Sequence, residues 1–417
     1  MKKKASLILI AMMIFSLVLT ACGGDQKNAD KNNTSNSGAK KQVTFWYYFG
    51  GNEETAIKGA IQKYNSSQDQ YQVVGQYVPF GDMKKRLSVG LMGEELPDIV
   101  TIDNPDHASF AAAGIFEDIT DRVNEWGQGD QYLDGPFESA KYEGKLYGLP
   151  FTSNTLALYY NTDMFKEAGI TGPPKTWDEL RETAKKLTTS DRHGLGFAAV
   201  KSEEGAFDFL PWLLSTGANY DSIDSPEAAR AFTFLTDLIK DGSVSKEVIN
   251  LSNSDTLKQF SSGKLAMMIN GPWNIAGVKA DAPNMNFAIA KLPIDKQDAS
   301  VLGGENIGII KGNNVDGAWD FLKWMSEADN LEAFLVQTGY FSPRKDVAEK
   351  SDHWKSDEYL SGFLEQMQSA QPRGPHPKWP EISSIIQEAY QKSFSMTMDP
   401  AAAAAEAGQK IKSVINQ

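Results

Sequence analysis

The chain has 417 residues, with 41 Lys and Arg against 54 Asp and Glu and a formal net charge of −13. This acidic balance argues against nucleic acid or anionic lipid as the main partner. The length is enough for two domains, and the single cysteine, Cys22, excludes an intrachain disulfide.

The first 21 residues have the pattern of a signal peptide. Lysines at positions 2–4 precede an apolar run that ends at Leu19, and this run is shorter than the ~20 residues that cross a bilayer. The small residues directly before Cys22 resemble the lipobox of bacterial lipoproteins, which implies that Cys22 becomes the mature N-terminus and carries a palmitate-type lipid. Residues 22–41 have no aromatic or large aliphatic side chain, so we expect a lipidated flexible tether.

Strand and helix patterns alternate after the tether. β-branched and aromatic residues predict strands over 43–48, 71–78 and 99–102. Apolar residues at helical spacing predict helices over 53–64 and 83–92. This order predicts an α/β fold with a parallel, doubly wound sheet, in which ligands bind beyond the carboxyl ends of the strands.

The rest of the chain continues with mixed signals. Thr176 and Glu179 have the spacing of a capping box, in which each side chain satisfies a free backbone N–H of the first helical turn. Pro226 at a first helical position and Gly242 beyond the last one predict the limits of another helix. Further patterns predict a hairpin over 142–151, strands over 155–161 and 264–269, and helices over 316–333 and 382–415.

Signals for catalysis or metal binding are weak. The four histidines are far apart, without the close His, Cys and carboxylate spacing of a zinc site, and neither a nucleophile elbow nor a P-loop is present. The run DNPDH at 103–107 offers oxygen ligands, but its Pro and Asp residues favour a turn after the strand. We therefore expect no metal, no cofactor and no catalytic residue, although a carboxylate pair for glycoside hydrolysis stays open because acidic residues are plentiful.

Aromatic residues at loop positions are more informative. A carbohydrate site combines aromatic rings, which pack on the C–H face of a sugar, with planar polar groups that bind its hydroxyls. Trp273 follows Asn270-Gly271-Pro272 at a strand-to-helix turn, an unusual place for a core tryptophan, and favours ligand contact. Trp212 has apolar neighbours on both sides and fits ligand contact and core packing equally.

The segments GEELPDIVTID, YEGKLYGLPF, LYYNTDMFKEAGITGPPKTWDEL, FSSGKLAMMINGPWN and GYFSPRKDV occur in this order over almost the whole mature chain. Together they resemble the carbohydrate-binding extracellular solute-binding proteins of ABC importers, relatives of the maltodextrin-binding proteins. The resemblance implies a periplasmic-binding-protein-like fold of two discontinuous lobes around a hinge and a ligand cleft. We expect one lobe over 42–153 with 306–346, and the other over 154–305 with 347–417.

Matching motifs also imply which residues face the cleft. Tyr48 and Phe49 end the first strand, Glu305 lies at the second crossing between the lobes, and Trp273 matches a stacking tryptophan. Where the maltodextrin binders carry an aromatic residue, this chain has Asp103, so the choice of sugar stays open. With Trp212 included, the expected ligand contacts are Trp46, Tyr48, Phe49, Asp103, Asn154, Trp212, Trp273, Glu305, Tyr340, Arg344, Arg373 and Trp379.

The resemblance implies a non-enzymatic receptor, a monomer anchored outside the bacterial cell membrane through Cys22. It would capture a mono- or oligosaccharide and deliver it to an ABC permease. Two alternatives stay open: a secreted glycoside-degrading enzyme, and a binding protein for a non-sugar solute. A phosphorylated ligand would need clustered cations, whereas the expected cleft positions hold only Arg344 and Arg373, with Asp103 and Glu305 against them.

Overall fold

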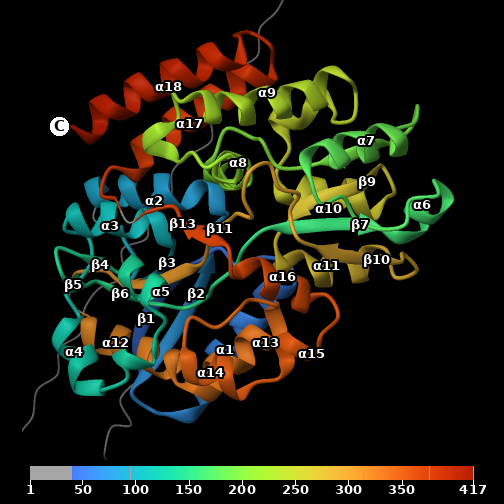
Figure 1. The fold of residues 1–417 in the computed structure, drawn as a ribbon. Helices are drawn as coiled ribbons and strands as arrows, with labels where there is room; N and C mark the ends of the chain where they lie inside the picture. Colours follow the sequence, from blue (N-terminus) through green and yellow to red (C-terminus); the bar gives the residue numbers. More distant parts are fainter. Residues whose placement is uncertain (1–39, 94, 313, 375, 417) are drawn as a thin grey trace, which may run out of the picture. The chain divides into compact units, whose positions relative to one another are not determined.

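Two mixed β-sheets, each flanked by helices, organise the chain in the computed structural model (Figure 1). The structure describes residues 40–416 except 94, 313 and 375. The expected signal peptide and almost all of the tether, with Cys22, lie outside the described residues.

The first sheet has the strand order β2-β1-β3-β12-β6. Strand β1 (Lys41–Tyr47) pairs in parallel with β2 (Tyr71–Tyr77) and β3 (Ile99–Asp103), as the strand–helix alternation predicts. Strand β12 (Glu305–Ile309) comes from far along the chain and pairs antiparallel with β3 and with β6 (Gly148–Pro150). All residues of β3 and β12 are buried, because the middle of such a sheet is covered on both faces.

Helices from both halves of the chain belong to this sheet's side of the structure. The continuous pattern over 316–333 resolves into two helices, because Glu327 has extended backbone angles (φ −62°, ψ 140°). The elements are α1 (Asn52–Ser67), α2 (Phe80–Gly93), α3 (Asn104–Ala112), α4 (Thr120–Trp126), α5 (Asp134–Ser139), the hairpin β4 (Lys141–Tyr142) and β5 (Lys145–Leu146), α12 (Val315–Ser326), α13 (Ala328–Thr338), α14 (Lys345–Lys350) and α15 (His353–Ser356).

The second sheet has the order β10-β7-β9-β8. All six residues of its strand β9 (Leu265–Asn270) are buried, and the helix α8 (Glu203–Ser215), which belongs to the same hydrophobic core, is almost wholly buried. The elements are β7 (Ala157–Asn161), α6 (Thr162–Glu167), α7 (Trp177–Leu187), β8 (His193–Gly196), α8 (Glu203–Ser215), α9 (Pro226–Lys240), α10 (Asn253–Ser261), β9 (Leu265–Asn270), α11 (Ile275–Asp281), β10 (Phe287–Ala290), α16 (Leu360–Met367), α17 (Trp379–Phe394) and α18 (Pro400–Ile415).

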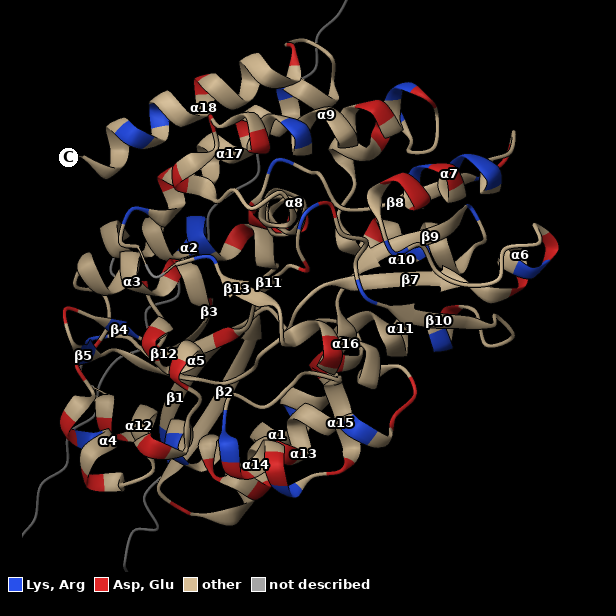
Figure 2. Cartoon of the chain, in the orientation of Figure 1, with Lys and Arg blue, Asp and Glu red and all other residues tan. Residues whose placement is uncertain are grey.

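Local sequence signals explain several helix ends. The Thr176 hydroxyl caps α7 by accepting from the Glu179 N–H at 3.3 Å, as expected, but the Glu179 carboxylate accepts from the N–H of Lys175, one residue before the expected position. The pattern over 382–415 divides between Phe394 and Pro400, and the Asp399 carboxylate at the end of this break caps α18. Along α7 the first turn is acidic and the last turn is basic (Figure 2), which is the favourable arrangement for a helix dipole.

Three chain segments connect the two sheets and lie side by side. The N–H of Ser153 donates to Phe341 O at 2.9 Å, and the N–H of Asn154 donates to Gly303 O at 3.0 Å. A glycine is required at position 304, where φ is 146° and a Cβ atom would lie 2.3 Å from the Thr152 carbonyl oxygen. A short parallel pair, β11 (Ser300–Leu302) with β13 (Ala370–Pro372), adjoins these segments.

Among the residues that the structure describes, no helix combines the length and the apolar character needed to cross a membrane.

Candidate functional site

A cavity of about 510 Å³ lies where the carboxyl ends of β1 and β3 meet the N-terminal end of α8 and the helices α10 and α11. The turn after β1 contributes Tyr48, Gly50 and Glu53 to its lining. A Cβ atom at Gly50 would lie 3.3 Å from the Tyr77 hydroxyl oxygen, so these two residues are close neighbours. Because the cavity lies beyond the carboxyl ends of β1 and β3, it occupies the position expected for ligands of an open α/β sheet.

Six aromatic residues line this cavity. The ring of Trp273 stacks on Tyr340 with centroids 6.1 Å apart and an interplanar angle of 29°, and it lies 6.4 Å from the ring of Phe207. Position 271 requires glycine, since a Cβ atom there would lie 1.9 Å from the Trp273 ring. The full aromatic set is Tyr48, Tyr77, Phe80, Phe207, Trp273 and Tyr340.

Charged groups from both sheets meet on the cavity wall. Arg373, just after β13, donates from both terminal nitrogens to the Asp103 carboxylate at 2.6 and 2.7 Å, and from Nη1 to Glu203 at 2.8 Å. Glu203 also accepts from Trp379 Nε1 at 3.0 Å and from the Ser383 hydroxyl. Burial raises the pKa of Asp103, whereas Arg373 opposes that change, so this ion cluster compensates its own charges rather than leaving them for a ligand.

Lys84 of α2 extends the same cluster. Its Nζ lies 3.0 Å from Asp106 and 3.9 Å from Glu203. Burial raises the pKa of Asp106 to about 7, and Lys84 counteracts part of that effect. The cluster thus links α2 and α3, which flank the first sheet, to α8 beside the second sheet.

Glu305 and Glu53 form a second acidic region. Burial raises the pKa of Glu305 to about 8, with the Thr152 hydroxyl opposing the shift and the charges of Asp103 and Glu53 adding to it. Burial likewise raises the pKa of Glu53 to about 7, against contacts with Tyr340 and the backbone at Gly50. Within the described part of the chain, the buried Oε1 of Glu53 has no hydrogen-bond partner.

A third acidic group lies at the start of α8. Glu204 accepts from the backbone N–H of Asn253 at 2.8 Å, and burial raises its pKa. One turn later, Asp208 is fully buried, and burial raises its pKa well above the usual value. Amide side chains complete this polar lining: Asn52, Asn154, Asn253 and Asn274.

The structure brings seven of the twelve expected ligand contacts together at the cavity. They come from widely separated parts of the chain, from the end of β1 to the segment after β13, and two of them, Asp103 and Arg373, bind each other. The seven are Tyr48, Asp103, Asn154, Trp273, Glu305, Tyr340 and Arg373.

The other five expected contacts do not line this cavity. Trp46 is 8% exposed and packs against α2 beneath the Arg86 guanidinium, 4.2 Å from its ring. Trp212 is 2% exposed and packs against Trp177 in the core beside the second sheet. Arg344 is buried because it binds Asp346 and the carbonyl oxygen of Ser326.

Phe49 and Trp379 lie directly behind lining residues. Phe49 is 1% exposed and packs edge-on against Tyr340 at 6.3 Å and Phe334 at 5.1 Å. Trp379 is fully buried and donates to Glu203. Both expected contacts therefore support residues of the cavity wall instead of facing the cavity.

Several lining residues lack a distinctive sequence signal. Glu53, Glu203 and Glu204 stand in first helical turns, where acidic residues are common in any helix. Phe207 and Asn253 follow ordinary helical patterns. Only their convergence in the tertiary structure identifies them as part of the site.

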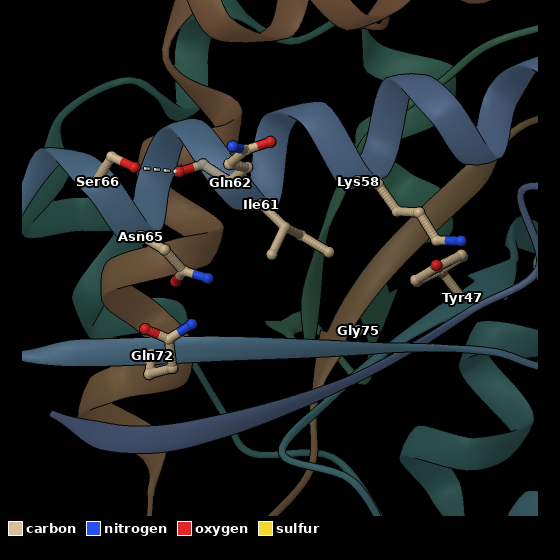
Figure 3. Close-up of a pocket in the computed structure, with 8 residues that line it drawn as sticks. All are labelled: Tyr47, Lys58, Ile61, Gln62, Asn65, Ser66, Gln72 and Gly75. Carbon is tan, nitrogen blue, oxygen red and sulfur yellow. Dashed lines mark hydrogen bonds between the residues drawn. The ribbon is translucent and has the colours of Figure 1, made fainter.

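No group of three or more His, Cys, Asp or Glu residues in the described ranges could hold a metal ion. A second hollow of about 410 Å³ lies between α1 and the edge strand β2, lined by Tyr47, Lys58, Ile61, Gln62, Asn65, Ser66, Gln72 and Gly75 (Figure 3). Asn65 is already engaged there with the backbone of Val73.

The fold and the cavity define a protein that can enclose a small polar ligand between two α/β lobes. The chain belongs to the family of bacterial extracellular solute-binding proteins, whose model matches residues 59–361. A structure of an ABC transporter solute-binding protein from Thermotoga lettingae TMO, bound with alpha-D-tagatose, matches with a TM-score of 0.82 and 27% identity. That match covers 89% of this chain and 100% of the other, and it confirms the predicted two-lobed fold.

Two curated relatives are named for different ligands. The chain is 25% identical over 358 residues to a maltotriose-binding protein of Pyrococcus abyssi (strain GE5 / Orsay), covering 81% of this chain and 75% of that protein. It is 27% identical over 309 residues to the sn-glycerol-3-phosphate-binding periplasmic protein UgpB of Escherichia coli (strain K12), covering 67% of this chain and 69% of that protein.

Proposed function

We propose that this protein is the receptor of an ABC sugar importer and that it captures a mono- or oligosaccharide. The observation that carries the proposal is the stacked pair Trp273–Tyr340, which shares one cavity with carboxylate and amide side chains. Such rings pack on the C–H faces of a sugar, and the planar polar groups bind its hydroxyls. Maltotriose and tagatose, named for the relatives above, belong to the same chemical class.

A phosphate ester, as in the name of the UgpB relative, fits this cavity less well. Arg373 is the single Lys or Arg among the described lining residues. Its terminal nitrogens already bind Asp103 and Glu203. A phosphate would therefore face uncompensated carboxylates.

In this proposal the protein acts by binding and closing, without catalysis. The proposed lobes are residues 42–153 with 306–346 and residues 154–305 with 347–417, with most of α14 and all of α15 from the second range lying beside α13 on the side of the first sheet (Figure 1). A sugar that contacts both lobes favours the closed form by its extra contacts there, and the permease recognises that form. The proposed site comprises the seven expected contacts that line the cavity.

The proposal includes a lipid anchor on Cys22, which keeps a monomeric receptor at the outer surface of the cell membrane. Changing Cys22→Ser should move the protein from the membrane fraction to the medium. Mass spectrometry of the N-terminal peptide should find acyl chains only in the unchanged protein. An unmodified Cys22 in the membrane fraction would contradict the anchor.

A thermal-shift panel of saccharides, amino acids, polyamines and glycerol phosphates tests the ligand class. A ligand at about 100 times its Kd stabilises the folded state by ~2.7 kcal/mol. Trp273→Ala should abolish the shift caused by the best sugar while the ligand-free protein stays folded. The matched control is Trp319→Ala, in α12 and outside the cavity lining, which should keep the shift. Stabilisation by a non-sugar alone would overturn the assignment.

A further inference from the structure

The cavity has a pronounced excess of negative charge. Arg373 is its one basic residue among the described lining positions. Six carboxylates face it from five elements or turns: Glu53, Asp103, Glu203, Glu204, Asp281 and Glu305. A neutral sugar needs some carboxylate acceptors, but it does not need an imbalance of this size.

Part of this charge is already compensated by the protein. Arg373 binds Asp103 and Glu203, and Glu203 has further partners in Trp379, Ser383 and Lys84. Neither Glu53 nor Glu305 has a salt bridge to a described residue. Asp103 and Glu203 therefore form the compensated part of the wall. Glu204, which accepts from the Asn253 N–H, and Asp281 also lack a salt bridge to a described residue, and Glu53 and Glu305 are the two of these four acids that lie beside the Tyr340 hydroxyl.

Buried polar atoms without a hydrogen-bond partner also indicate what kind of ligand fits the cavity. Within the described chain, three acceptor oxygens of lining residues lack a hydrogen bond: Glu53 Oε1, Asn154 Oδ1 and Asn253 Oδ1. The Tyr48 hydroxyl, which can donate or accept, and Arg373 Nε also lack one. Because an unsatisfied buried polar atom is costly, the complementary ligand is rich in donors.

Glu53 and Glu305 are close enough for the charge of one to act on the other. The charge of Glu53 adds to the rise in the pKa of Glu305, and both carboxylates act on the Tyr340 hydroxyl. Burial keeps both groups partly protonated in the ligand-free cavity, so a bound cation would favour their ionised forms. The rings of Tyr340 and Trp273, stacked beside them, offer faces that attract a cation.

We propose that the saccharide carries a positively charged amino group, as an amino sugar does, and that this group binds between Glu53 and Glu305. An ammonium group has three donors and no acceptor, which matches the excess of free acceptors. This inference rests on the proposed function, and it narrows the ligand from saccharides in general to cationic saccharides.

Calorimetric titration with matched sugars tests the inference. The probes are glucosamine, glucose and N-acetylglucosamine, with the β-1,4-linked glucosamine disaccharide and cellobiose as a longer pair. Each amine should bind at least about tenfold tighter than its neutral counterpart, corresponding to about 1.4 kcal/mol. N-acetylation, which removes the charge, should abolish the advantage.

Variants at Glu53 and Glu305 test where the amino group binds. Glu53→Gln and Glu305→Gln should each weaken the binding of the amine more than the binding of its neutral counterpart, so that the ratio of the two affinities falls. Glu54→Gln is the matched control, since Glu54 is the next residue on α1, binds Lys58 at 2.7 Å and does not line the cavity; it should keep the full advantage. Either glutamine variant at the site is sufficient if the other fails to fold.

The outcomes separate the two proposals. Neutral sugars that bind as tightly as the amines would overturn the inference and leave the sugar-receptor proposal intact. An amine advantage that survives both Glu53→Gln and Glu305→Gln would overturn the assigned position. If no saccharide binds while a polyamine or phosphate ester does, the proposed function fails, and the inference fails with it.

Discussion

Arg373 is the residue that joins the two sides of the cavity. Its guanidinium binds Asp103 at the end of β3 and Glu203 at the start of α8, and its side chain is only 3% exposed. Its Cζ atom also lies 4.5 Å from the Phe207 ring centroid. Removing the guanidinium would leave two buried carboxylates without their main counter-charge.

Arg373→Met should therefore destabilise the protein by about 3–5 kcal/mol in urea unfolding. Adding Asp103→Asn should recover part of this loss, because it removes one uncompensated charge. Arg230→Met, which breaks the exposed ion pair with Asp295, should cost less than about 1 kcal/mol. Equal losses for Arg373→Met and Arg230→Met would show that the buried cluster has no special role.

The raised pKa of Glu305 predicts a pH effect on stability. Its pKa is about 8 in the folded protein, against the usual 4.5, so the folded state binds more protons than the unfolded state between these values. Its contribution to stability accordingly falls as the pH rises through this window. Glu305→Gln removes this effect. The stability of the variant relative to the unchanged protein should therefore increase as the pH rises from 5 to 9.

Melting temperatures at the two pH values measure that gain. Asp346→Asn serves as the control, because Arg344 lowers the pKa of Asp346 and its contribution is complete above the pKa of the unfolded chain. The cost of Asp346→Asn should hence be the same at pH 5 and pH 9. A pH-independent difference for Glu305→Gln would contradict burial as the cause of its raised pKa.

At the residue scale, the sequence indicated which residues line the cavity better than it indicated which residues they bind. Asp103 and Arg373 were both expected to contact ligand, and both line the cavity, but they bind each other across 270 positions of the chain. Phe49 was expected to touch sugar as the last ring of its strand, and instead it packs behind Tyr340. No periodicity reports which of two adjacent rings faces a cavity and which faces the core.

At the scale of elements, the turn between β9 and α11 depends on Gly271. Its carbonyl oxygen accepts from the Tyr159 hydroxyl at 2.6 Å, and the Trp273 ring lies where a Cβ atom would be. Gly271→Ala should displace that ring and abolish the sugar-dependent thermal shift, as Trp273→Ala does. Gly59→Ala, on an open position of α1, should keep sugar binding and add about 0.5–1 kcal/mol of stability. A normal shift in Gly271→Ala would contradict the importance of this turn.

Most elements were predictable because their signals are local. Strand β1 and helix α1 follow from β-branched and helical patterns, Thr176 caps α7 as expected, and α9 begins at the expected Pro226. The break at Glu327 between α12 and α13 was missed, since neither proline nor glycine marks it. No local pattern places β12 in the first sheet, because its partner strand β3 lies far away in the chain; only the resemblance implied that residues from 306 onward belong with 42–153.

At the scale of the whole molecule, ligand binding should change both sides of the cavity together. Hydrogen–deuterium exchange should slow in residues 48–53 and 203–208 when the best sugar is added, because the ligand contacts both. The surface helix α18 serves as an internal reference and should exchange at an unchanged rate. Slowing on one side alone would contradict binding between the lobes.

The sequence by itself determined the properties that depend on local composition and order. These are the acidic charge, the alternation of strands and helices that defines the α/β class, and the ordered motifs that indicated the family. Tertiary structure alone decided which side chains face the cavity. It placed Glu53, Glu203 and Phe207 beside the expected residues and withdrew Trp212 and Arg344 into the core. Side-chain direction and charge pairing are set by contacts between distant segments, which no single stretch of sequence contains.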